Sequence, residues 1–452
     1  SAFLNNLKTE IQYTYKDVLA YSMCFLYNVT YHCFIKLKGK RIKEMKKFWD
    51  KWTEIALVKR ILVGLILGAI LGIAVPQATG IAILGDVFVS ALKAIAPLLV
   101  FFLVISSLCN AGKSHGGVIK TVIILYMFST VLAAVIAVFA SMAFPVKMTL
   151  ANAATDTSAP QGIVEVLNNL LLNVVANPVS SLVNANYVGI LMWAVLLGLA
   201  FRAADKMTKK VLADVADGIS MVVTWIINLA PFGIFGLVFN TVSTNGLDIF
   251  TTYGKLLLLL VGCMLFIYFV TNPLLVYWCI RQNPYPLIFH CLKRSALTAF
   301  FTRSSAANIP VNMKVCEEMG LDRDTYSVTI PLGATINMDG AAITITVMTM
   351  ATAFTLGIHV DIPTAIILSL LAALSACGAS GVAGGSLLLI PMACSLFGIS
   401  DDISMQVVAV GFIIGVVQDS VETALNSSSD LLLSASAEFR QWRLEGKEIK
   451  FK

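Results

Sequence analysis

Six apolar runs follow one another along residues 56–280, and each is long enough to cross a lipid bilayer as a helix. A transmembrane helix needs about 20 mainly apolar residues. The chain is 58% hydrophobic and 13% charged over its 452 residues, whereas a soluble domain carries about 25% charged residues. One water-facing globule cannot bury so much apolar surface, so the pattern predicts an all-α polytopic membrane protein. The runs cover residues 56–76, 83–108, 118–144, 186–204, 216–242 and 253–280.

Lysine and arginine gather in alternate loops, which indicates the orientation in the membrane. Cytoplasmic loops carry an excess of both residues, whereas 145–185 contains only Lys147 and 244–252 contains none. We therefore predict that both termini lie in the cytoplasm. The net charge of +6 is then a sign of topology and not a nucleic-acid-binding surface. The cytoplasmic set comprises Lys113, Lys120, Arg202, Lys206, Lys209, Lys210, Arg281, Arg440, Arg443, Lys447, Lys450 and Lys452.

Residues 1–44 differ from the rest of the chain, with Tyr-rich and Lys-rich stretches ahead of the first apolar run. They lack the charged, apolar and small-residue regions of a signal peptide. We interpret them as an N-terminal extension outside the working fold. The alternative is an amphipathic cytoplasmic arm.

Two segments in the second half predict re-entrant hairpins. Residues 285–313 form a weak membrane segment, interrupted by charged residues and Pro310, and 363–399 hold two apolar arms of about 14 residues around the Gly-rich segment 378–386. Arms this short suit re-entry better than crossing, and irregular backbone at membrane depth must face protein or a wet cavity.

The two hairpin regions also echo each other, which favours an inverted repeat. Each has an Ile-Pro pair, ending at Pro310 and at Pro391, and each pair is followed by an intramembrane aspartate, Asp339 or Asp419. Paired, interrupted hydrophobic segments are a sequence signature of a transporter binding site.

The segment Asn337-Met338-Asp339-Gly340 lies between two short apolar stretches and predicts a break in a membrane helix. Asn, Asp and Gly favour turns over helix. An unwound backbone offers carbonyl oxygens, which together with a carboxylate suit a cation. An ordinary loop between two short helices is the alternative, although each flank alone is too short to span.

A second polar set follows helical spacing in the last apolar region, 402–436. Residues three or four apart share one helix face, and an unpaired carboxylate at the bilayer centre costs at least about 2.5 kcal/mol. Ligands that are cations explain three acids on one stripe better than polar contacts between helices do. A solvated helix end is the alternative. The stripe comprises Asp419, Glu422, Thr423, Asn426 and Asp430.

Weaker polar signals lie elsewhere. Tyr126, Ser129 and Thr130 share the third run, but hydroxyls in membrane helices usually bond to their own backbone. Ser304 and Ser305 follow Arg303 at the first hairpin tip. Backbone N–H groups there, and in the Gly-rich second tip, suit an anion such as a substrate carboxylate.

An enzyme is disfavoured. Gly378-Ala379-Ser380-Gly381 resembles the GxSG of rhomboid-type intramembrane proteases, but no histidine follows Ser380 to act as its base. The sequence also lacks HExxH, P-loop and GxGxxG motifs. Transport would therefore draw its energy from an ion gradient, unless a partner hydrolyses ATP.

Together these residues resemble the dicarboxylate/amino acid:cation symporter family, the glutamate-transporter homologues. The resemblance covers about residues 55–440. It is carried by the Arg303-Ser304-Ser305 tip, the 337–340 motif, the Gly-rich second hairpin and the Asp419 stripe. Within the family the chain is most similar to bacterial serine/threonine transporters of the cytoplasmic membrane.

The resemblance implies eight transmembrane helices plus two re-entrant helical hairpins, arranged as inverted repeats, in a homotrimer embedded in lipid. It further implies a scaffold formed by 45–117 and 145–250, a moving transport domain formed by 118–144 and 251–440, and a cytoplasmic tail, 441–452. We expect the last two membrane helices, around Asp339 and Asp419, both to be broken.

Sodium, the implied co-transported ion, would have three sites by this resemblance. The first would use Asp430 with carbonyls of Gly333, Asn337 and Asn426. The second would use backbone near Thr335 and under the second hairpin. The third would use Asp339 with the hydroxyl cluster in the third run. The residues implied at the second and third sites are Thr335, Ala376, Cys377 and Ala379, and Tyr126, Ser129, Thr130 and Asp339.

The substrate would lie between the hairpin tips. The resemblance implies that Asp419 and Thr423 hold its amino group with carbonyls of Arg303 and Val382, and that Asn426 and the Ser305 N–H hold its carboxylate. The Arg303 side chain reaching into the pocket is the open alternative. The substrate-binding residues implied are Arg303, Ser304, Ser305, Val382, Asp419, Glu422, Thr423 and Asn426.

Two departures from acidic-substrate relatives set the expected substrate. Glu422 replaces an arginine, the bidentate partner of a side-chain carboxylate, and Ala341 replaces a threonine. A glutamate would repel an acidic substrate, so we predict sodium-coupled symport of serine and threonine. A sodium- or proton-coupled glutamate or dicarboxylate symporter is the alternative, followed by a channel. The second tip also has Ala383 where relatives have proline, so its stiffness stays open.

Overall fold

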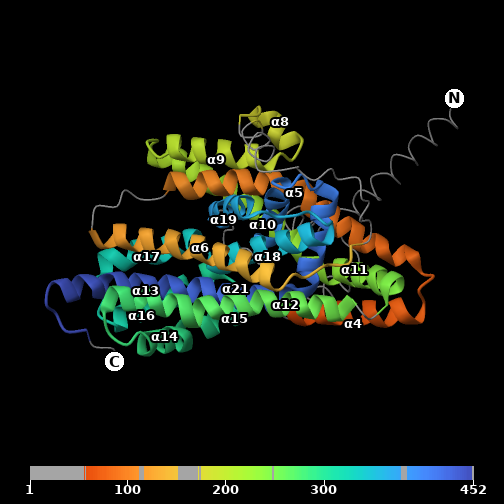
Figure 1. Cartoon of the computed structure of the whole chain (residues 1–452). Helices are drawn as coiled ribbons and strands as arrows, with labels where there is room; N and C mark the ends of the chain where they lie inside the picture. The colour runs from red at the N-terminus through yellow and green to blue at the C-terminus, as the bar shows by residue number, and fades with distance from the viewer. Residues whose placement is uncertain are drawn as a thin grey trace, which may run out of the picture.

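The computed structural model describes residues 57–110, 117–150, 175–246, 249–377 and 384–449, together with residues 55 and 172. Every regular element in these ranges is a helix (Figure 1). The predicted N-terminal extension and residues 378–383 of the second hairpin tip lie outside the described residues. Six helices or joined helices within the described part are long and apolar enough to cross a membrane, which agrees with a multi-pass membrane protein.

The members of a first helix group pack mainly against one another. Gly64, Gly68 and Gly72 line one face of α4, and a Cβ on each would lie within 3.0 Å of a backbone carbonyl oxygen of α11. Small residues every fourth position allow two membrane helices to approach this closely. The group comprises α4 (Leu57–Ala74), η2 (Thr79–Ala82), α5 (Ile83–Asn110), α8 (Pro178–Val183), α9 (Tyr187–Phe201), α10 (Lys206–Asn228) and α11 (Ala230–Asn245).

The predicted span 216–242 is wrong as a single helix. Helix α10 ends at Asn228 and α11 begins at Ala230, with Leu229 between them. Pro231 stands in the first turn of α11. It has no N–H to donate to the preceding turn, and its ring clashes with that turn's carbonyl, so the α10 ladder stops there.

A second helix group contains α6 and everything from α12 onward. Its long helices α6, α12 and α21 contact one another and run side by side (Figure 1). Helices α12 and α13 continue through the π-helical turn η3, just before Pro273. The membrane helices here are α6 (Gly117–Ala143), α12 (Ile249–Phe266), η3 (Ile267–Thr271), α13 (Asn272–Ile280), α17 (Arg323–Ile336), α18 (Asp339–Thr355) and α21 (Asp401–Leu444).

The first hairpin region consists of two arms that meet at Arg303. The inward arm comprises α14 (Tyr285–Cys291), η4 (Leu292–Ala296) and α15 (Leu297–Thr302), and α16 (Ser305–Glu318) returns. Arg303 is left-handed, with φ 52°, which reverses the chain, and the Ser304 hydroxyl caps α16 at Ala307 N. With 14 residues, α16 is shorter than the about 20 residues of a full span.

The second hairpin region has unequal arms. Helix α19 (Ile362–Ala376) has 15 residues, and the described part of the return arm is a shorter apolar helical stretch, Gly385–Ser395. A 3₁₀ turn, η5 (Gly385–Leu389), precedes the short helix α20 (Ile390–Ser395). Pro391 lies in the first turn of α20, where a residue without an N–H starts a helix but cannot continue one.

One of the two expected helix breaks is present. Helix α17 ends at Ile336 and α18 begins at Asp339, so the predicted break at 337–338 is confirmed. The predicted break in the last helix is wrong, because α21 is continuous for 44 residues. The two helices differ because of their local sequences. No Gly or Pro lies within 416–430, and the polar side chains of this stretch find partners without unwinding the backbone.

Candidate functional site

The polar stripe of α21 faces the broken helix formed by α17 and α18. Its five members are each 6% exposed or less, and three of them meet a partner across the interface. Asp430 contacts Asn337, Asn426 contacts Gly340 and Glu422 contacts Thr344. Residue numbers rise along one partner and fall along the other, so α18 and this part of α21 run antiparallel. The predicted shared face is confirmed.

We call these three contacts between α21 and the broken helix the ladder. Two oxygens without hydrogen-bond partners lie at its Asp430 end. Asn337 Nδ2 donates to Asp430 Oδ1 at 2.9 Å and to Ser429 Oγ at 2.9 Å. Asn337 Oδ1 and Asp430 Oδ2 are both buried, and neither has a hydrogen-bond partner among the described residues. Buried polar oxygens are normally satisfied, and carboxylate and amide oxygens are hard ligands suited to a small cation.

Gly333 allows the close packing at this point. A Cβ on Gly333 would lie 2.8 Å from Asp430 Oδ1 and 2.8 Å from the Tyr126 hydroxyl. Only glycine therefore lets α17 approach the carboxylate. The structure thus brings together Gly333, Asn337, Asn426 and Asp430, the four residues implied for the first sodium site.

Asp339 begins α18 at the helix break, and two hydroxyls of α6 hold its carboxylate. Ser129 Oγ donates to Oδ2 at 2.7 Å and Thr130 Oγ1 to Oδ1 at 3.1 Å. Asn272 of α13, which the sequence did not suggest, lies beside them, and its Nδ2 has no partner in the described structure. Three of the four residues implied for the third site therefore meet through their side chains.

Tyr126 points its hydroxyl elsewhere. The hydroxyl donates to the Asp430 carbonyl oxygen at 2.8 Å and lies 2.8 Å from Ser434 Oγ. It therefore supports the Asp430 end of the site rather than the Asp339 carboxylate. Its phenol ring is fully buried, so it fixes α6 against α21.

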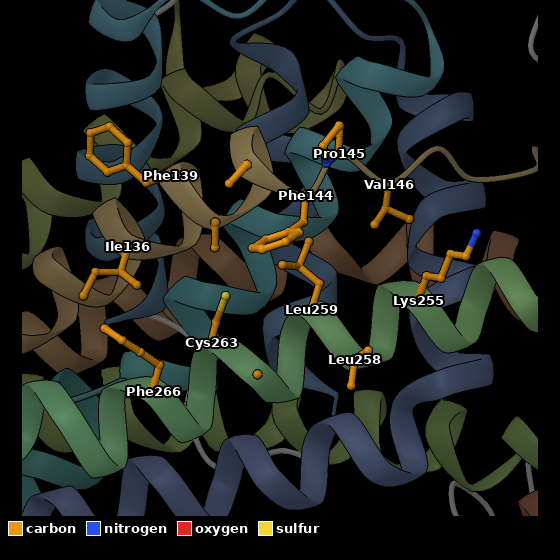
Figure 2. Close-up of a pocket in the computed structure, with 13 residues that line it drawn as sticks. Ile136, Phe139, Phe144, Pro145, Val146, Lys255, Leu258, Leu259, Cys263 and Phe266 are labelled. Carbon is orange, nitrogen blue, oxygen red and sulfur yellow. The ribbon is translucent and has the colours of Figure 1, made fainter.

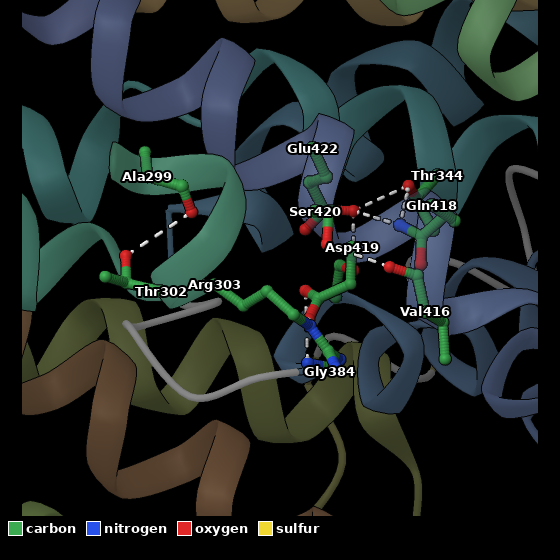
Figure 3. Close-up of polar contacts among 11 residues, drawn as sticks. Ala299, Thr302, Arg303, Thr344, Gly384, Val416, Gln418, Asp419, Ser420 and Glu422 are labelled. Carbon is green, nitrogen blue, oxygen red and sulfur yellow. Dashed lines mark hydrogen bonds and ion pairs between the residues drawn. The ribbon is translucent and has the colours of Figure 1, made fainter. Parts of the chain in front are cut away.

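An ion pair joins the tip of the first hairpin to Asp419, the first residue of the α21 stripe. Arg303 donates to Asp419 Oδ2 from Nε at 2.7 Å and from Nη2 at 2.6 Å, as Figure 3 shows. Gly384 N donates to the other oxygen, Oδ1, at 3.3 Å. The side chain of Arg303 therefore reaches into the site, which is the alternative that the sequence left open. Asp419 thus connects residues from both hairpin regions.

Glu422 is held by three donors, none of which was predicted. Thr344 Oγ1 at 2.7 Å, Ser386 Oγ at 2.9 Å and Gln418 Nε2 at 2.5 Å all donate to Oε2. Figure 3 shows Thr344 and Gln418 beside Glu422. Ser386 belongs to the second hairpin, so this carboxylate also links that hairpin to α21. The sequence carries one usable signal, since Gln418 lies four residues before Glu422 on the same face.

The remaining predicted positions lie around this ladder. The Cys377 thiol, at the end of α19, lies 3.6 Å from the Ile336 carbonyl oxygen at the helix break, next to Thr335 and Ala376. Ser305 is buried, 5% exposed, at the start of α16. Thr423 lies on α21 between Asp419 and Asn426. Ala379 and Val382 are outside the described residues.

A second buried network, also missed by the sequence, ties the first hairpin to α21. Asn308 Nδ2 donates to Ser427 Oγ at 2.8 Å, and Asn312 Nδ2 donates to the Ser427 carbonyl oxygen at 2.8 Å. Ser295, on the other arm, donates to Asn312 Oδ1 at 2.5 Å. Asn308 Oδ1 is buried without a hydrogen-bond partner among the described residues, but the other bonds of this network connect both arms of the hairpin to α21.

Known proteins match the chain over nearly all of this architecture. Residues 57–438 match the sodium:dicarboxylate symporter family. A serine/threonine transporter, SstT, of Bifidobacterium adolescentis is 57% identical over 412 residues, which is 91% of this chain and 96% of that protein.

Proteins of the same name from streptococci are similar. That of Streptococcus thermophilus is 55% identical over 88% of this chain and 100% of its own length. That of Streptococcus agalactiae is 57% identical over 87% and 98%. The matched range includes both hairpin regions and the α21 stripe, and this chain belongs to the sodium:dicarboxylate symporter family.

Proposed function

We propose that the protein is a secondary transporter that carries serine or threonine across the cytoplasmic membrane together with sodium. The observation that carries this proposal is the ladder between α21 and the broken helix. It gathers three acids, two amides and a helix break inside an apolar bundle. Buried charge at membrane depth is tolerated where it serves an ion or substrate, and the similar proteins are named serine/threonine transporters.

The finer assignments follow from the family. We assign one sodium ion to Asp430, Asn337, Asn426 and Gly333, and a second to Asp339 with Ser129 and Thr130. A third would lie where Thr335 meets the end of α19. The unpartnered oxygens of Asn337 and Asp430 support the first assignment most directly, because a cation would supply the missing partner.

The substrate would bind at the end of the ladder that is nearer to Asp419, between the two hairpins. Asp419 suits its ammonium group, and Asn426 with the Ser305 N–H suits its carboxylate. Glu422 would face the side chain of the substrate. Its carboxylate already accepts hydrogen bonds from the hydroxyls of Thr344 and Ser386. A hydroxyl of serine or threonine is therefore a fitting donor, whereas a second carboxylate on the substrate would be repelled.

The proposed architecture has eight transmembrane helices, two re-entrant hairpins and cytoplasmic termini, in a homotrimer. The first helix group would be the fixed scaffold and the second the moving domain that gives alternating access. The separation of their contacts supports this division. The second hairpin would be the gate, since buried asparagines tie the first hairpin to α21.

Sodium coupling would supply ample driving force. A zwitterionic substrate adds no net charge, so each sodium ion carries one charge inward, worth about 2.3 kcal/mol at 100 mV. A tenfold sodium gradient adds about 1.4 kcal/mol. One ion could therefore support a roughly 500-fold substrate gradient.

Uptake by purified protein in liposomes tests the proposal. We expect radiolabelled serine to accumulate with an inward sodium gradient, to fail to accumulate when potassium replaces sodium, and to be displaced by threonine but not by glutamate. Accumulation without sodium at fixed pH would refute sodium coupling. Competition by glutamate as strong as that by threonine would refute the role of Glu422, and flux that never saturates would indicate a channel.

A further inference from the structure

An apolar groove on the outside of the second helix group has properties that the transport site does not explain. It lies between α6 and α12, has a volume of about 840 Å³ and is lined by thirteen residues, of which Lys255 alone is charged. The others include Phe139, Phe144, Leu258 and Phe266, which are 47–74% exposed. In a chain that spans the membrane, such a groove faces lipid tails.

The charge at one end of the groove selects for an anion. Figure 2 shows Lys255 near Val146 at one end, while Ile136, Phe139 and Phe266 lie at the other. Lys255 forms no ion pair with a carboxylate in the described part of the chain. Lys147, also exposed, follows Val146 directly. Two cations therefore stand at the end where α6 stops and α12 starts.

The length of the groove matches one leaflet. Lys255 and Phe266 lie on the same helix, α12, and a rise of 1.5 Å per residue puts them about 16 Å apart. The hydrocarbon core of a bilayer is about 30 Å thick, so one leaflet spans about 15 Å. A lipid with its phosphate at Lys255 would place the end of its acyl chain near Phe266.

We propose that this groove is a binding site for an anionic phospholipid of the leaflet that contains Lys255. The phosphate and a negatively charged head group would bind Lys255 and Lys147, and one acyl chain would lie along the apolar floor. Basic residues beside an apolar surface at the head-group level favour anionic lipid over zwitterionic lipid. The lipid would contact α6, the helix that carries Ser129 and Thr130.

Photocrosslinking tests the site with the full chain in vesicles of phosphatidylethanolamine containing one-fifth phosphatidylglycerol. Either lipid carries a diazirine on its acyl chain, and crosslinked peptides are mapped by mass spectrometry. We expect phosphatidylglycerol to label 136–146 and 258–266 several-fold more than phosphatidylethanolamine does. Equal labelling by both lipids would show ordinary lipid contact, and labelling absent from these helices would show that something else fills the groove. Either result overturns the proposal.

Two variants with matched controls test separately the recognition of the head group by the lysines and the binding of the acyl chain in the groove. Lys255→Gln with Lys147→Gln should abolish the preference for phosphatidylglycerol, whereas Lys120→Gln, on the other end of α6, should not. Gly262→Leu should reduce labelling by both lipids several-fold, because a Cβ at this groove-lining glycine meets nothing within 4 Å and the side chain can fill the groove. Gly254→Leu is the matched control. A Cβ at Gly254 also meets nothing within 4 Å, but this residue does not line the groove, so labelling should stay unchanged. A preference that survives the lysine changes, or labelling that survives Gly262→Leu, would refute the site.

Discussion

At the scale of single residues, the site is defined by which buried oxygens have partners and which do not. Glu422 receives three donors on one oxygen, and Asp419 receives a guanidinium. Asp430 and Asn337, by contrast, each keep an oxygen without a partner among the described residues. This contrast supports the proposal that Asp430 binds sodium, whereas the carboxylates of Asp419 and Glu422 face the substrate site and the hairpins.

Asp430→Asn should weaken sodium coupling without unfolding the protein. The change keeps the size of the side chain but removes the charge that balances the ion, so we expect the sodium concentration for half-maximal serine uptake to rise at least about tenfold. Glu438→Gln is the matched control. It neutralises another buried carboxylate of α21, one that accepts from Asp322 N at 2.6 Å, and should lower thermal stability while sodium dependence stays unchanged. An Asp430→Asn protein with normal sodium dependence would exclude this carboxylate as a ligand.

Arg303→Gln should strengthen serine binding. The Arg303 guanidinium holds Asp419 Oδ2, and a substrate ammonium needs the same carboxylate, so the two cations compete. Removing the internal cation should lower the Kd for serine about three- to tenfold at saturating sodium, measured by calorimetry. Arg294→Gln, which breaks an exposed ion pair with Glu318, should leave it unchanged. A weaker affinity after Arg303→Gln would mean that the arginine binds substrate.

At the scale of elements, the broken helix and the continuous helix have different tasks. The break between α17 and α18 brings Asn337 and Asp339 to two separate clusters. Helix α21 instead presents its polar residues at regular intervals along one unbroken face. The ladder forms only because α18 packs very close to α21, and this depends on Gly340. A Cβ there would lie 3.0 Å from atoms of Glu422, including its backbone carbonyl oxygen.

Gly340→Ala should therefore impair transport more than stability. The added methyl group pushes α18 away from α21 and loosens the contacts of Thr344 with Glu422 and of Gly340 N with Asn426. We expect uptake of serine to fall about tenfold, since a 1 Å displacement at a site can reduce rates about a hundredfold and the shift needed here is a few tenths of an ångström. Gly415→Ala on α21 meets nothing within 4 Å and should transport normally. Equal uptake by both variants would show that the ladder tolerates a wider separation.

At the scale of the whole molecule, few polar contacts join the two helix groups within the described residues. Lys93 Nζ of α5 lies 2.7 Å from Asp402 Oδ1 and 3.8 Å from Asp401 Oδ2, at the start of α21. Phe88 packs edge-on against Phe412 nearby. The Lys93 side chain is 38% exposed and that of Asp402 is 87% exposed. An exposed ion pair of this kind contributes about 0–1 kcal/mol, so it can break without a large penalty when the groups shift.

Bridging this contact should stop transport reversibly. In Lys93→Cys with Asp402→Cys, we expect a short bis-methanethiosulfonate, which joins the two thiols through disulfide bonds, to reduce serine uptake at least about tenfold, because the proposed alternating access requires relative motion of the two groups. Reductant should restore it. Arg294→Cys with Glu318→Cys replaces an ion pair inside the second group and should tolerate the same reagent. Full activity of the bridged Lys93 and Asp402 pair would argue against sliding of one group along the other.

The sequence alone determined the membrane class, the main helices, the break at 337–338 and the shared face of the α21 stripe. Each of these follows from hydropathy, helical period or the turn preference of a few neighbouring residues, which are local properties. The same local information led to errors where proline decided a boundary, as at Pro231 between α10 and α11, and where polar residues without glycine or proline stayed helical, as around Asp419.

Only the tertiary structure decided which partner each polar residue takes. Arg303 and Asp419 are 116 residues apart in the chain, and Glu422 is 78 residues from Thr344. The direction of the Tyr126 hydroxyl, the asparagine network under the first hairpin and the groove at Lys255 are likewise results of packing. No sequence period links residues on different helices, because the distance between them is set by how the helices pack and not by their separation along the chain.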